Sequence, residues 1–557
     1  ELISAEDIES RGHGRSYPYA SRSPWEPVGE LLRSMHGIDT TIPPSEAADG
    51  IVGDDDSPLL HDAVSTALGI PASDTRVLPS LGQGERVGIV RDALARHLFA
   101  GPRQRLLVLD DLHWADHATL EFLEQLVASP HEGRTLLLLL ARPALSGETG
   151  LSRLIDACPD VVELSPLTQA ESRELLDRLL EPHDVPDRLL DRISTRSSGN
   201  PLFLEEFTRS LLDDGTLREV AGVVQAVGDH ELVNVPDSVE SLLSTRIDGL
   251  DAEAKRVLQY AAIVGRRFWA GAISDALARR PVDDELSTLQ HGSLVRSEPQ
   301  SVVEGDREFV FEHLLMQEVA YGGLLRGLRA ELHEAVAEWL EERLGARAGE
   351  HDDWIAFHYE RSGHPERAVP YLERAAEMAR DSGALADAAE LLRRAADMTG
   401  DPEVEARVLC AAEEVSALHG DLAERHWYIE RIEELADQAM SPELVATARY
   451  RRARMALDGG DLSRARELGE EALDLYRQVG DVSLEGDALR LLGRVEHLWG
   501  QYPLAQERYE AGLRCETEAG DEDGQADMHD RLGLVQVDQG NFAEALTYLD
   551  RSRALYA

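Results

Sequence analysis

Residues 106–116 read LLVLDDLHWAD, an unbroken apolar run that ends in two acids. Apolar residues without alternation suit a parallel strand buried on both faces, and polar residues after such a strand lie at the sheet edge where α/β folds bind ligands. In nucleoside-triphosphatases the first acid of such a pair holds Mg²⁺, and the second polarises the attacking water. The alternative is a strand that ends in a solvated Asp110–Asp111 turn. This stretch alone supports the two interpretations about equally.

The phosphate loop that such a strand normally serves, G-x-x-x-x-G-K-[ST], is absent from the sequence. The only lysine, Lys255, stands in an amphipathic helical stretch without a glycine loop. The glycines Gly82 and Gly84 lack a neighbouring lysine and precede the acidic strand. We interpret them as the start of a helix that continues over 85–99.

A second apolar run, TLLLLLARP at 135–143, predicts another buried strand. Arg142 follows this run and is therefore expected at the same sheet edge as Asp110. An arginine in that place can sense the γ-phosphate of a nucleotide, and the alternative is an arginine that caps a loop over the acidic pair. Because helical and strand patterns alternate, residues 1–166 are predicted to form a partial α/β nucleotide-binding core.

The middle of the chain has a helical period, interrupted by SSGNPLFLEEF. Gly199 and Pro201 indicate a turn at a helix start, since glycine adopts unusual backbone angles and proline suits a first helical turn. We predict a helical lid with a polar linker over 167–234. Over 235–345, helices flank two short apolar runs separated by turn residues, which indicates a winged-helix module.

The carboxyl third, 346–557, is repetitive. Glycines recur every 40 residues and alanines follow at the same interval: Gly420, Gly460, Gly500 and Gly540, then Ala465, Ala505 and Ala545. A glycine turn between two helices, with alanine where the helices approach closely, is typical of a tetratricopeptide-type solenoid. The first unit departs from the pattern, with Arg425 in the alanine position. Such solenoids bind peptides or proteins on a concave face, and the alternative is a purely structural solenoid.

The composition is strongly acidic, with 105 acidic and 56 basic residues and a formal net charge of −49 over 557 residues. Such a surface repels nucleic acid, so we expect no direct nucleic-acid partner. One hypothesis is a halophilic archaeal origin, where high ionic strength screens self-repulsion; the alternative is an arginine-rich bacterium of high GC content.

Three cysteines lie far apart in the sequence, namely Cys158, Cys410 and Cys515. This spacing suggests neither a disulfide framework nor a metal site. The longest apolar stretch is too short to span a bilayer, and the N-terminus has no signal-peptide pattern, so we expect no membrane partner. A reducing cytoplasm is the predicted location.

Five motifs occur in a fixed order before the repeats: LLVLDDLHWAD, LLLLLARP, GNPLFLEEF, VPDSVESLLSTRIDGLDAEAKRVLQYAAIVG and FVFEHLLMQEVAYGGLL. In this order the chain resembles the signal-transduction ATPases with numerous domains (STAND). That AAA-related group includes the maltose-regulator-like transcription factors and the ATPase modules beside nucleotide cyclases and Ser/Thr kinases. The resemblance covers nearly the whole chain.

The resemblance implies ATP or ADP and Mg²⁺ as cofactors. In the α/β core, Asp110 would hold Mg²⁺, Asp111 would be the catalytic acid, and Arg142 would be the sensor. The phosphate loop of the family lies a few tens of residues before the point where this chain begins, so we expect the chain to be truncated after that loop.

Other positions match family motifs outside the core. Gly199 and Pro201 match the G-x-P turn that approaches the adenine, and His313 matches a winged-helix histidine that contacts a nucleotide phosphate. His113 and Trp114 belong to the motif of the acidic strand but are assigned packing roles.

The resulting prediction is an ATP-dependent switch that regulates transcription or signalling. Nucleotide is held between the α/β core and the winged helix, a protein partner or small inducer binds the repeats, and the bound state favours an open, homo-oligomeric form. The alternative is a non-catalytic repeat scaffold with a degenerate ATPase core. The sequence does not reveal the effector output, the inducer or the oligomeric state.

Overall fold

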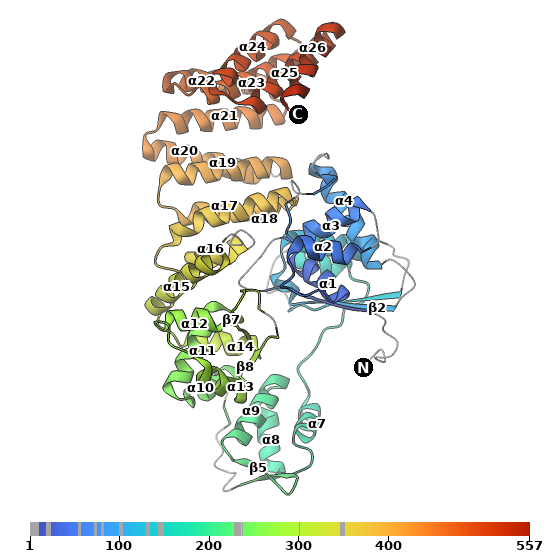
Figure 1. Ribbon diagram of the computed structural model, residues 1–557, viewed down its shortest axis with the longest axis vertical. Helices are drawn as coiled ribbons and strands as arrows, with labels where there is room; N and C mark the ends of the chain where they lie inside the picture. The colour runs from blue at the N-terminus through green and yellow to red at the C-terminus, as the bar shows by residue number, and fades with distance from the viewer. Residues whose placement is uncertain are drawn as a thin grey trace. The chain divides into compact units, whose positions relative to one another are not determined.

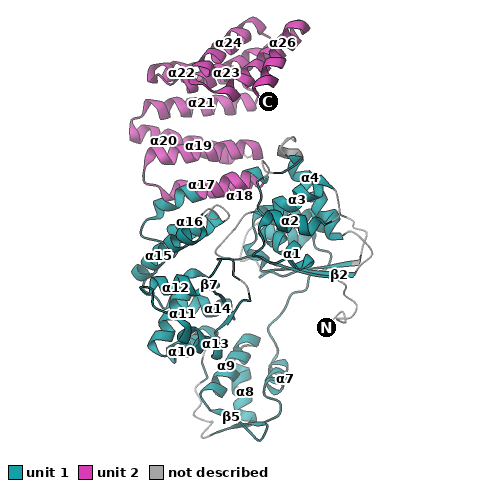
Figure 2. Ribbon diagram, viewed as in Figure 1, with its two compact units in different colours: residues 1–371, 381–383 teal, residues 372–380, 384–557 magenta. Residues whose placement is uncertain are grey.

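The computed structural model describes residues 10–17, 24–53, 57–71, 75–78, 83–99, 104–129, 134–142, 150–227, 235–236, 238–299, 301–345, 351–420 and 422–556 (Figure 1). The chain divides into two compact units (Figure 2). Unit 1 comprises residues 1–371 and 381–383, and unit 2 comprises residues 372–380 and 384–557. The first five residues, ELISA, whose sequence suggests the end of a strand, lie outside the described residues.

Unit 1 begins with a parallel sheet in the order β1-β2-β3, whose strands are β1 (Ser10–Arg15), β2 (Gln104–Asp110) and β3 (Arg134–Leu139). The acidic strand β2 lies in the centre, where Leu107 and Leu109 are fully buried. Around the sheet are six helices among the described residues: α1 (Glu26–His36), α2 (Pro44–Val52), α3 (Pro58–Ala67), α4 (Gln83–Phe99), α5 (His117–Ala128) and α6 (Gly150–Ala157). A small parallel α/β sheet is therefore present, as predicted.

Strand β1 has the sequence SRGHGR and contains no large apolar residue. Helix α1 packs so closely on it that a Cβ atom at Gly14 would lie 2.0 Å from the carbonyl oxygen of Pro27. Glycine is required there because backbone takes the place that a side chain would fill.

Strand β3 was predicted to be buried, and this is wrong for one face. Leu136, Leu138 and Leu140 are 46%, 43% and 39% exposed, while the leucines between them are half-buried. In the described part of the chain no element covers the side that bears these three leucines. The apolar run identified a strand but did not reveal which of its faces is covered.

The next segment of unit 1 holds α7 (Gln169–Leu180), α8 (Asp187–Arg196) and α9 (Pro201–Asp213) with a small sheet of β4 (His183–Asp184), β6 (Val223–Ala226) and β5 (Leu217–Val220). The predicted helices are present. The polar linker predicted from residue 218 contains the β5–β6 hairpin instead. Its two turn residues, Ala221 and Gly222, have φ of 55° and 82°, as in a type I′ turn that joins antiparallel strands tightly.

The last part of unit 1 contains helices and an antiparallel sheet in the order β7-β9-β8. Its elements are α10 (Val239–Asp248), α11 (Ala252–Val264), β7 (Arg267–Trp269), α12 (Ala270–Ala276), α13 (Asp283–His291), β8 (Val295–Ser297), β9 (Glu308–Phe311), α14 (Leu314–Gly322), α15 (Arg326–Leu344), α16 (Asp352–Glu360) and η6 (Pro365–Ala368). Phe268, Phe309 and Phe311 form its aromatic core. The predicted hairpin is present and gains β7 as a third strand; the winged-helix assignment stays a prediction.

Unit 2 is a solenoid of paired antiparallel helices (Figures 1 and 2). Its helices are α17 (Val369–Asp381, which starts in unit 1), α18 (Leu385–Met398), α19 (Pro402–His419), α20 (Leu422–Ala439), α21 (Pro442–Asp458), α22 (Leu462–Val479), α23 (Val482–Leu498), α24 (Tyr502–Ala519), α25 (Glu522–Asp538) and α26 (Phe542–Leu555).

The repeat glycines lie where the helices of a pair join. Gly420, Gly460, Gly500 and Gly540 all have φ between 75° and 87°. The alanines of the pattern, Ala465, Ala505 and Ala545, are at most 2% exposed. The helical repeats are therefore of the tetratricopeptide type, as predicted. Among the described residues no helix is both long and apolar enough to cross a membrane.

Candidate functional site

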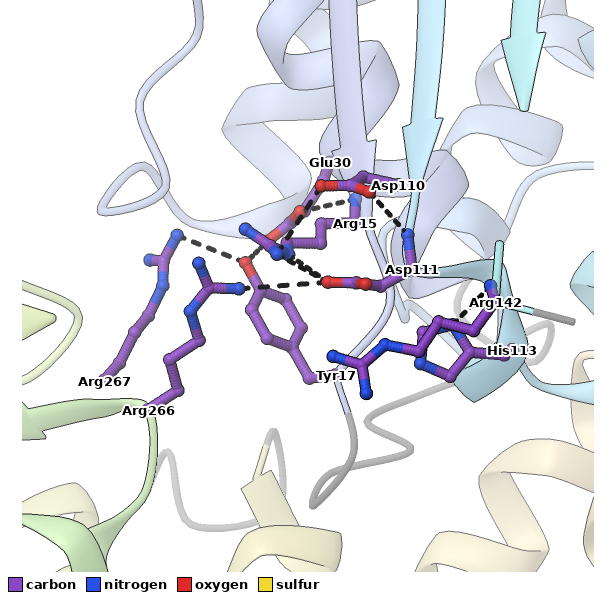
Figure 3. A network of polar contacts seen from close by, with 9 residues as sticks. All are labelled: Arg15, Tyr17, Glu30, Asp110, Asp111, His113, Arg142, Arg266 and Arg267. Carbon is purple, nitrogen blue, oxygen red and sulfur yellow. Dashed lines mark hydrogen bonds and ion pairs between the residues drawn. The ribbon is translucent and has the colours of Figure 1, made fainter. Parts of the chain in front are cut away.

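The two acids of β2 lie at the carboxyl edge of the parallel sheet (Figure 3). Asp110 is the last residue of the strand, and its Oδ1 accepts a hydrogen bond of 2.9 Å from the backbone N–H of Asp111. Asp111 has a φ of 57°, a left-handed angle that aspartate tolerates better than most residues, and begins the short turn η3 (Leu112–Trp114). The chain turns immediately after β2 and leaves both carboxylates at the sheet edge.

Arg15, at the end of β1, binds this acid pair. The parallel register places it opposite Asp110. Its Nε and Nη2 lie 2.8 and 2.5 Å from Oδ2 of Asp111, and its Nη2 lies 3.5 Å from Oδ2 of Asp110. A second guanidinium, Arg266 just before β7, has its Nη1 3.9 Å from the same oxygen of Asp111. Two partly buried carboxylates are thus faced by two arginines.

Mg²⁺ fits this acid pair in part. It prefers carboxylate oxygens, and in nucleotide sites one or two protein carboxylates suffice. Asp110 is 27% exposed on its side chain, so it is accessible, but a cation there would compete with the guanidinium of Arg15. Nowhere in the described ranges do three or more His, Cys, Asp or Glu side chains gather in a way that could hold a metal ion.

A contact with His113 holds the backbone of Arg142 near the acid pair. The backbone N–H of Arg142 donates to Nδ1 of His113 at 3.4 Å, which holds the chain after β3 against the turn after β2. Burial lowers the pKa of His113, the charge of Arg142 lowers it further, and Asp111 and Asp110 oppose both effects. The carboxyl edge of the sheet therefore carries two acids, an imidazole and the arginines Arg15 and Arg142, and the sensor role of Arg142 stays a prediction.

Gly199, Pro201 and His313 do not belong to the polar network of Figure 3. Gly199 has a φ of 76°, and a Cβ atom there would lie 2.2 Å from the carbonyl oxygen of Leu167, whose own N–H donates to the Gly199 carbonyl at 2.9 Å. Pro201 occupies the first turn of α9, capped by Asn200, as predicted. This close packing explains why position 199 is a glycine, and the explanation needs no bound ligand.

His313 precedes α14 and faces a buried carboxylate of α9. Its Nε2 lies 3.5 Å from Oε1 of Glu206, a residue 1% exposed that also pairs with Arg246 and Arg209. Burial alone would raise the pKa of Glu206, but the hydrogen bond from His313 and the two arginines lower it below its ordinary value. His313 thus joins the lid segment to the segment that contains the β7-β9-β8 sheet.

No sequence pattern pointed to Arg15 or Arg266, and His113 was assigned a packing role. His113 could have been suspected, because it follows the acids by two positions in a short turn. Arg15 lies 96 residues before Asp111, in a strand without apolar side chains. Only the pairing of β1 with β2 brings it to the site.

Comparison with known families finds two matches. Residues 444–518 match the tetratricopeptide repeat model, and residues 168–217 match a domain of unknown function (DUF8739). The second range covers α7 to α9. A protein of Rhizobium meliloti (strain 1021), "Uncharacterized protein R02095", is 27% identical over 320 residues, which is 55% of this chain and 29% of the relative. The chain thus spans less than a third of the length of that relative.

Several solved structures match this chain at low similarity. The signal-transduction ATPase with a tetratricopeptide repeat sensor, PH0952 from Pyrococcus horikoshii, is 13% identical, with a TM-score of 0.37, and the match covers 97% of this chain and 76% of that one. NprR in complex with its peptide NprX is 14% identical, with a TM-score of 0.31, over 41% of this chain and 67% of that one. The apo form of RapI is 10% identical, with a TM-score of 0.30, over 41% of this chain and 97% of that one.

Proposed function

We propose that this chain is part of an ATP-dependent signal-transduction switch whose repeats bind a protein partner or a small inducer. The observation that carries the proposal is the carboxyl edge of the parallel sheet, where Asp110, Asp111 and Arg142 follow two adjacent strands. Ligand sites of open α/β sheets form at this edge. The alternating helices and parallel strands of unit 1 support the same reading.

In this proposal each residue at the edge has one role. Asp110 would hold Mg²⁺, Asp111 would orient and polarise a water, and Arg142 would sense the charge of a phosphate. Bound Mg²⁺ would neutralise part of the negative charge of the phosphate groups. The exposed leucines of β3, Leu136 and Leu138, form the surface against which a further strand or helix of such a core would pack.

Gly199, Pro201 and His313 would act at a distance from the acid pair. The ion pair of His313 with Glu206 links two segments of unit 1, so a contact of the imidazole with a phosphate would compete with that pair. Such competition gives two states with different contacts, which is what ligand control requires. Transcriptional or signalling output would come from an effector linked to this chain.

The test measures ATP binding and phosphate release by the full-length product of the gene, in molar KCl. Asp110→Asn is expected to abolish Mg²⁺-dependent binding. Asp111→Asn is expected to keep binding and to slow hydrolysis by about 10²-fold or more. Asp160→Asn, an exposed acid of unit 1, is the matched control and should change neither quantity.

A non-catalytic repeat scaffold is the second candidate. The ion pair of Arg15 with Asp111 favours it, because this pair gives the acids a structural partner. No ATP binding by the wild-type full-length protein would establish the scaffold and make Asp110 an ordinary strand end. Arg15→Gln separates the two further: in a switch it frees the acids and strengthens Mg²⁺ binding, whereas in a scaffold it only lowers stability.

A further inference from the structure

A cavity of about 330 Å³ lies in unit 1 between the end of β1 with helix α1 and the β7-β9-β8 sheet. Five arginines line it: Arg15, Arg33, Arg266, Arg267 and Arg296. The acidic residues that line it are Glu30 and Glu298. A positive surface of this kind is unexpected in a chain of net charge −49. Its volume lies at the lower end of the range of small-molecule pockets, roughly 300–1,000 Å³.

Four of these arginines already have close partners: Arg15 pairs with Asp111, and Arg33 donates to the carbonyl oxygen of Asp39 at 2.7 Å. Arg267 donates hydrogen bonds of 3.3 Å to Oε1 of Glu308 and to the hydroxyl of Tyr17, and Arg296 pairs with Glu298 at 3.0 Å. The Tyr17 hydroxyl in turn donates to Glu30 at 3.1 Å. Both glutamates that line the cavity therefore already have a partner within hydrogen-bond distance.

Arg266 is the exception. Its backbone is fixed, because the N–H of Phe311 in β9 donates to the Arg266 carbonyl at 2.9 Å. Its side chain is 14% exposed, its Nε is buried and has no hydrogen-bond partner among the described residues, and its ion pair with Asp111 is long, at 3.9 Å. Burial lowers the pKa of Arg266, and the neighbouring charge of Arg15 lowers it further. A buried guanidinium with unused donors is costly unless an anion pairs with it.

Arg15 and Arg266 converge on the same carboxylate oxygen (Figure 3). Two guanidiniums at one point match a group with more than one negative charge and several acceptor oxygens, and arginine forks bind phosphate oxygens in pairs. A single carboxylate offers one charge and fewer oxygens. The chemistry of the cavity therefore favours phosphate.

We propose that this cavity binds a small molecule that carries a phosphate group, with the phosphate held by Arg266 and Arg15 and the remainder toward Arg33 and Tyr17. The site adjoins the nucleotide site of the proposed function, because Arg15 and Arg266 also contact Asp111, but it does not require ATP hydrolysis. Because a bound phosphate competes with Asp111 for both arginines, ligand binding loosens the contacts of that acid. Any effect of this on Mg²⁺ at Asp110 rests on the proposed function.

The test titrates the 557-residue chain with inorganic phosphate and with pyrophosphate by calorimetry, at a constant high KCl concentration. Saturable binding is expected for at least one of them, weakened at least tenfold by Arg266→Gln. Arg178→Gln, on an arginine of α7 that is 72% exposed, is the matched control and should bind as the wild type does. Binding only of pyrophosphate indicates a larger phosphate ligand, and binding of both indicates that the free ion suffices.

Asp110→Asn distinguishes the two sites: it removes a negative charge 3.5 Å from Nη2 of Arg15, so it should strengthen phosphate binding while it abolishes Mg²⁺-dependent ATP binding. Arg266→Lys keeps the positive charge and should bind phosphate better than Arg266→Gln does. This comparison separates a loss of charge from a folding defect. Absence of saturable binding by the wild type, or equal affinity in Arg266→Gln, would overturn the proposal.

Discussion

Glu413 and Arg425 form a buried ion pair inside the helix pair α19–α20, with Nε of Arg425 2.8 Å from Oε1 of Glu413. Both side chains are at most 3% exposed. In the next pair, 40 residues on, the same two positions hold Ala453 and Ala465. The arginine that breaks the repeat pattern is therefore matched by an acid that breaks it on the facing helix.

Replacing either partner alone should destabilise unit 2. Glu413→Ala also removes the carboxylate whose Oε2 lies 3.0 and 3.1 Å from Arg451 and Arg454, so we expect a loss of about 3–5 kcal/mol. Arg425→Ala should cost less, since Glu413 keeps those two partners. The double variant reproduces the two alanines of the next repeat and should lose less than the sum, measured by urea denaturation. Additive losses would show that the pair is not coupled.

Met440 stands where the two following repeats have Gly480 and Gly520. All three residues have positive φ, 51° for the methionine, and a non-glycine residue is strained at that angle. Met440→Gly should therefore stabilise unit 2 by about 1 kcal/mol. Thermal unfolding measures this gain. Met440→Ala removes the same exposed side chain but keeps Cβ, so an equal gain in that control would refute the role of backbone strain.

Two buried histidines should make unit 1 sensitive to acid. Nδ1 of His333 lies 2.9 Å from Nδ1 of His358, and Nε2 of His333 lies 3.1 Å from the Tyr321 hydroxyl. Burial lowers the pKa of both, with help from the charge of Arg361, and brings that of His333 to about 3. The folded state thus holds them neutral, whereas the unfolded chain takes up protons below about pH 6.5.

The unfolded state binds more protons in this window, so the stability of unit 1 should fall as the pH drops from about 6.5 toward 3. Each histidine contributes about 1.4 kcal/mol per pH unit. In His333→Gln the loss between pH 7.5 and 5.0 should be smaller than in the wild type, by chemical denaturation. His364→Gln, on an exposed histidine, should keep the full loss; equal behaviour of the two variants would contradict the assignment.

The halophile hypothesis predicts that KCl stabilises the chain. At molar salt the screening length is about 3 Å, so repulsion among the surface carboxylates nearly vanishes. The midpoint of thermal unfolding at pH 7.5 should rise between low and molar KCl. Near pH 4.7, the isoelectric point, the net charge is close to zero and the gain should shrink. A midpoint that does not change with salt at pH 7.5 would favour the bacterial alternative.

What the sequence could predict was local. The apolar run of β2 predicts a strand, and the glycine and alanine period of unit 2 predicts helix pairs, because each pattern depends only on nearby residues. The strand β1 was not predicted, because its glycines serve the close approach of α1 and leave no apolar pattern. The partners of the acids, Arg15 and Arg266, lie far away in the sequence and meet Asp111 only through tertiary packing.

The constant interval of 40 residues gives unit 2 a fixed increment of growth. Successive helix pairs are separated by the same kind of turn, as at Gly480 and Gly520, so residues 481–520 could be removed or duplicated in one genetic event without shifting any helix face. The solenoid can therefore lengthen or shorten in whole pairs while unit 1 stays unaltered. The length of the solenoid can therefore change independently of the α/β core.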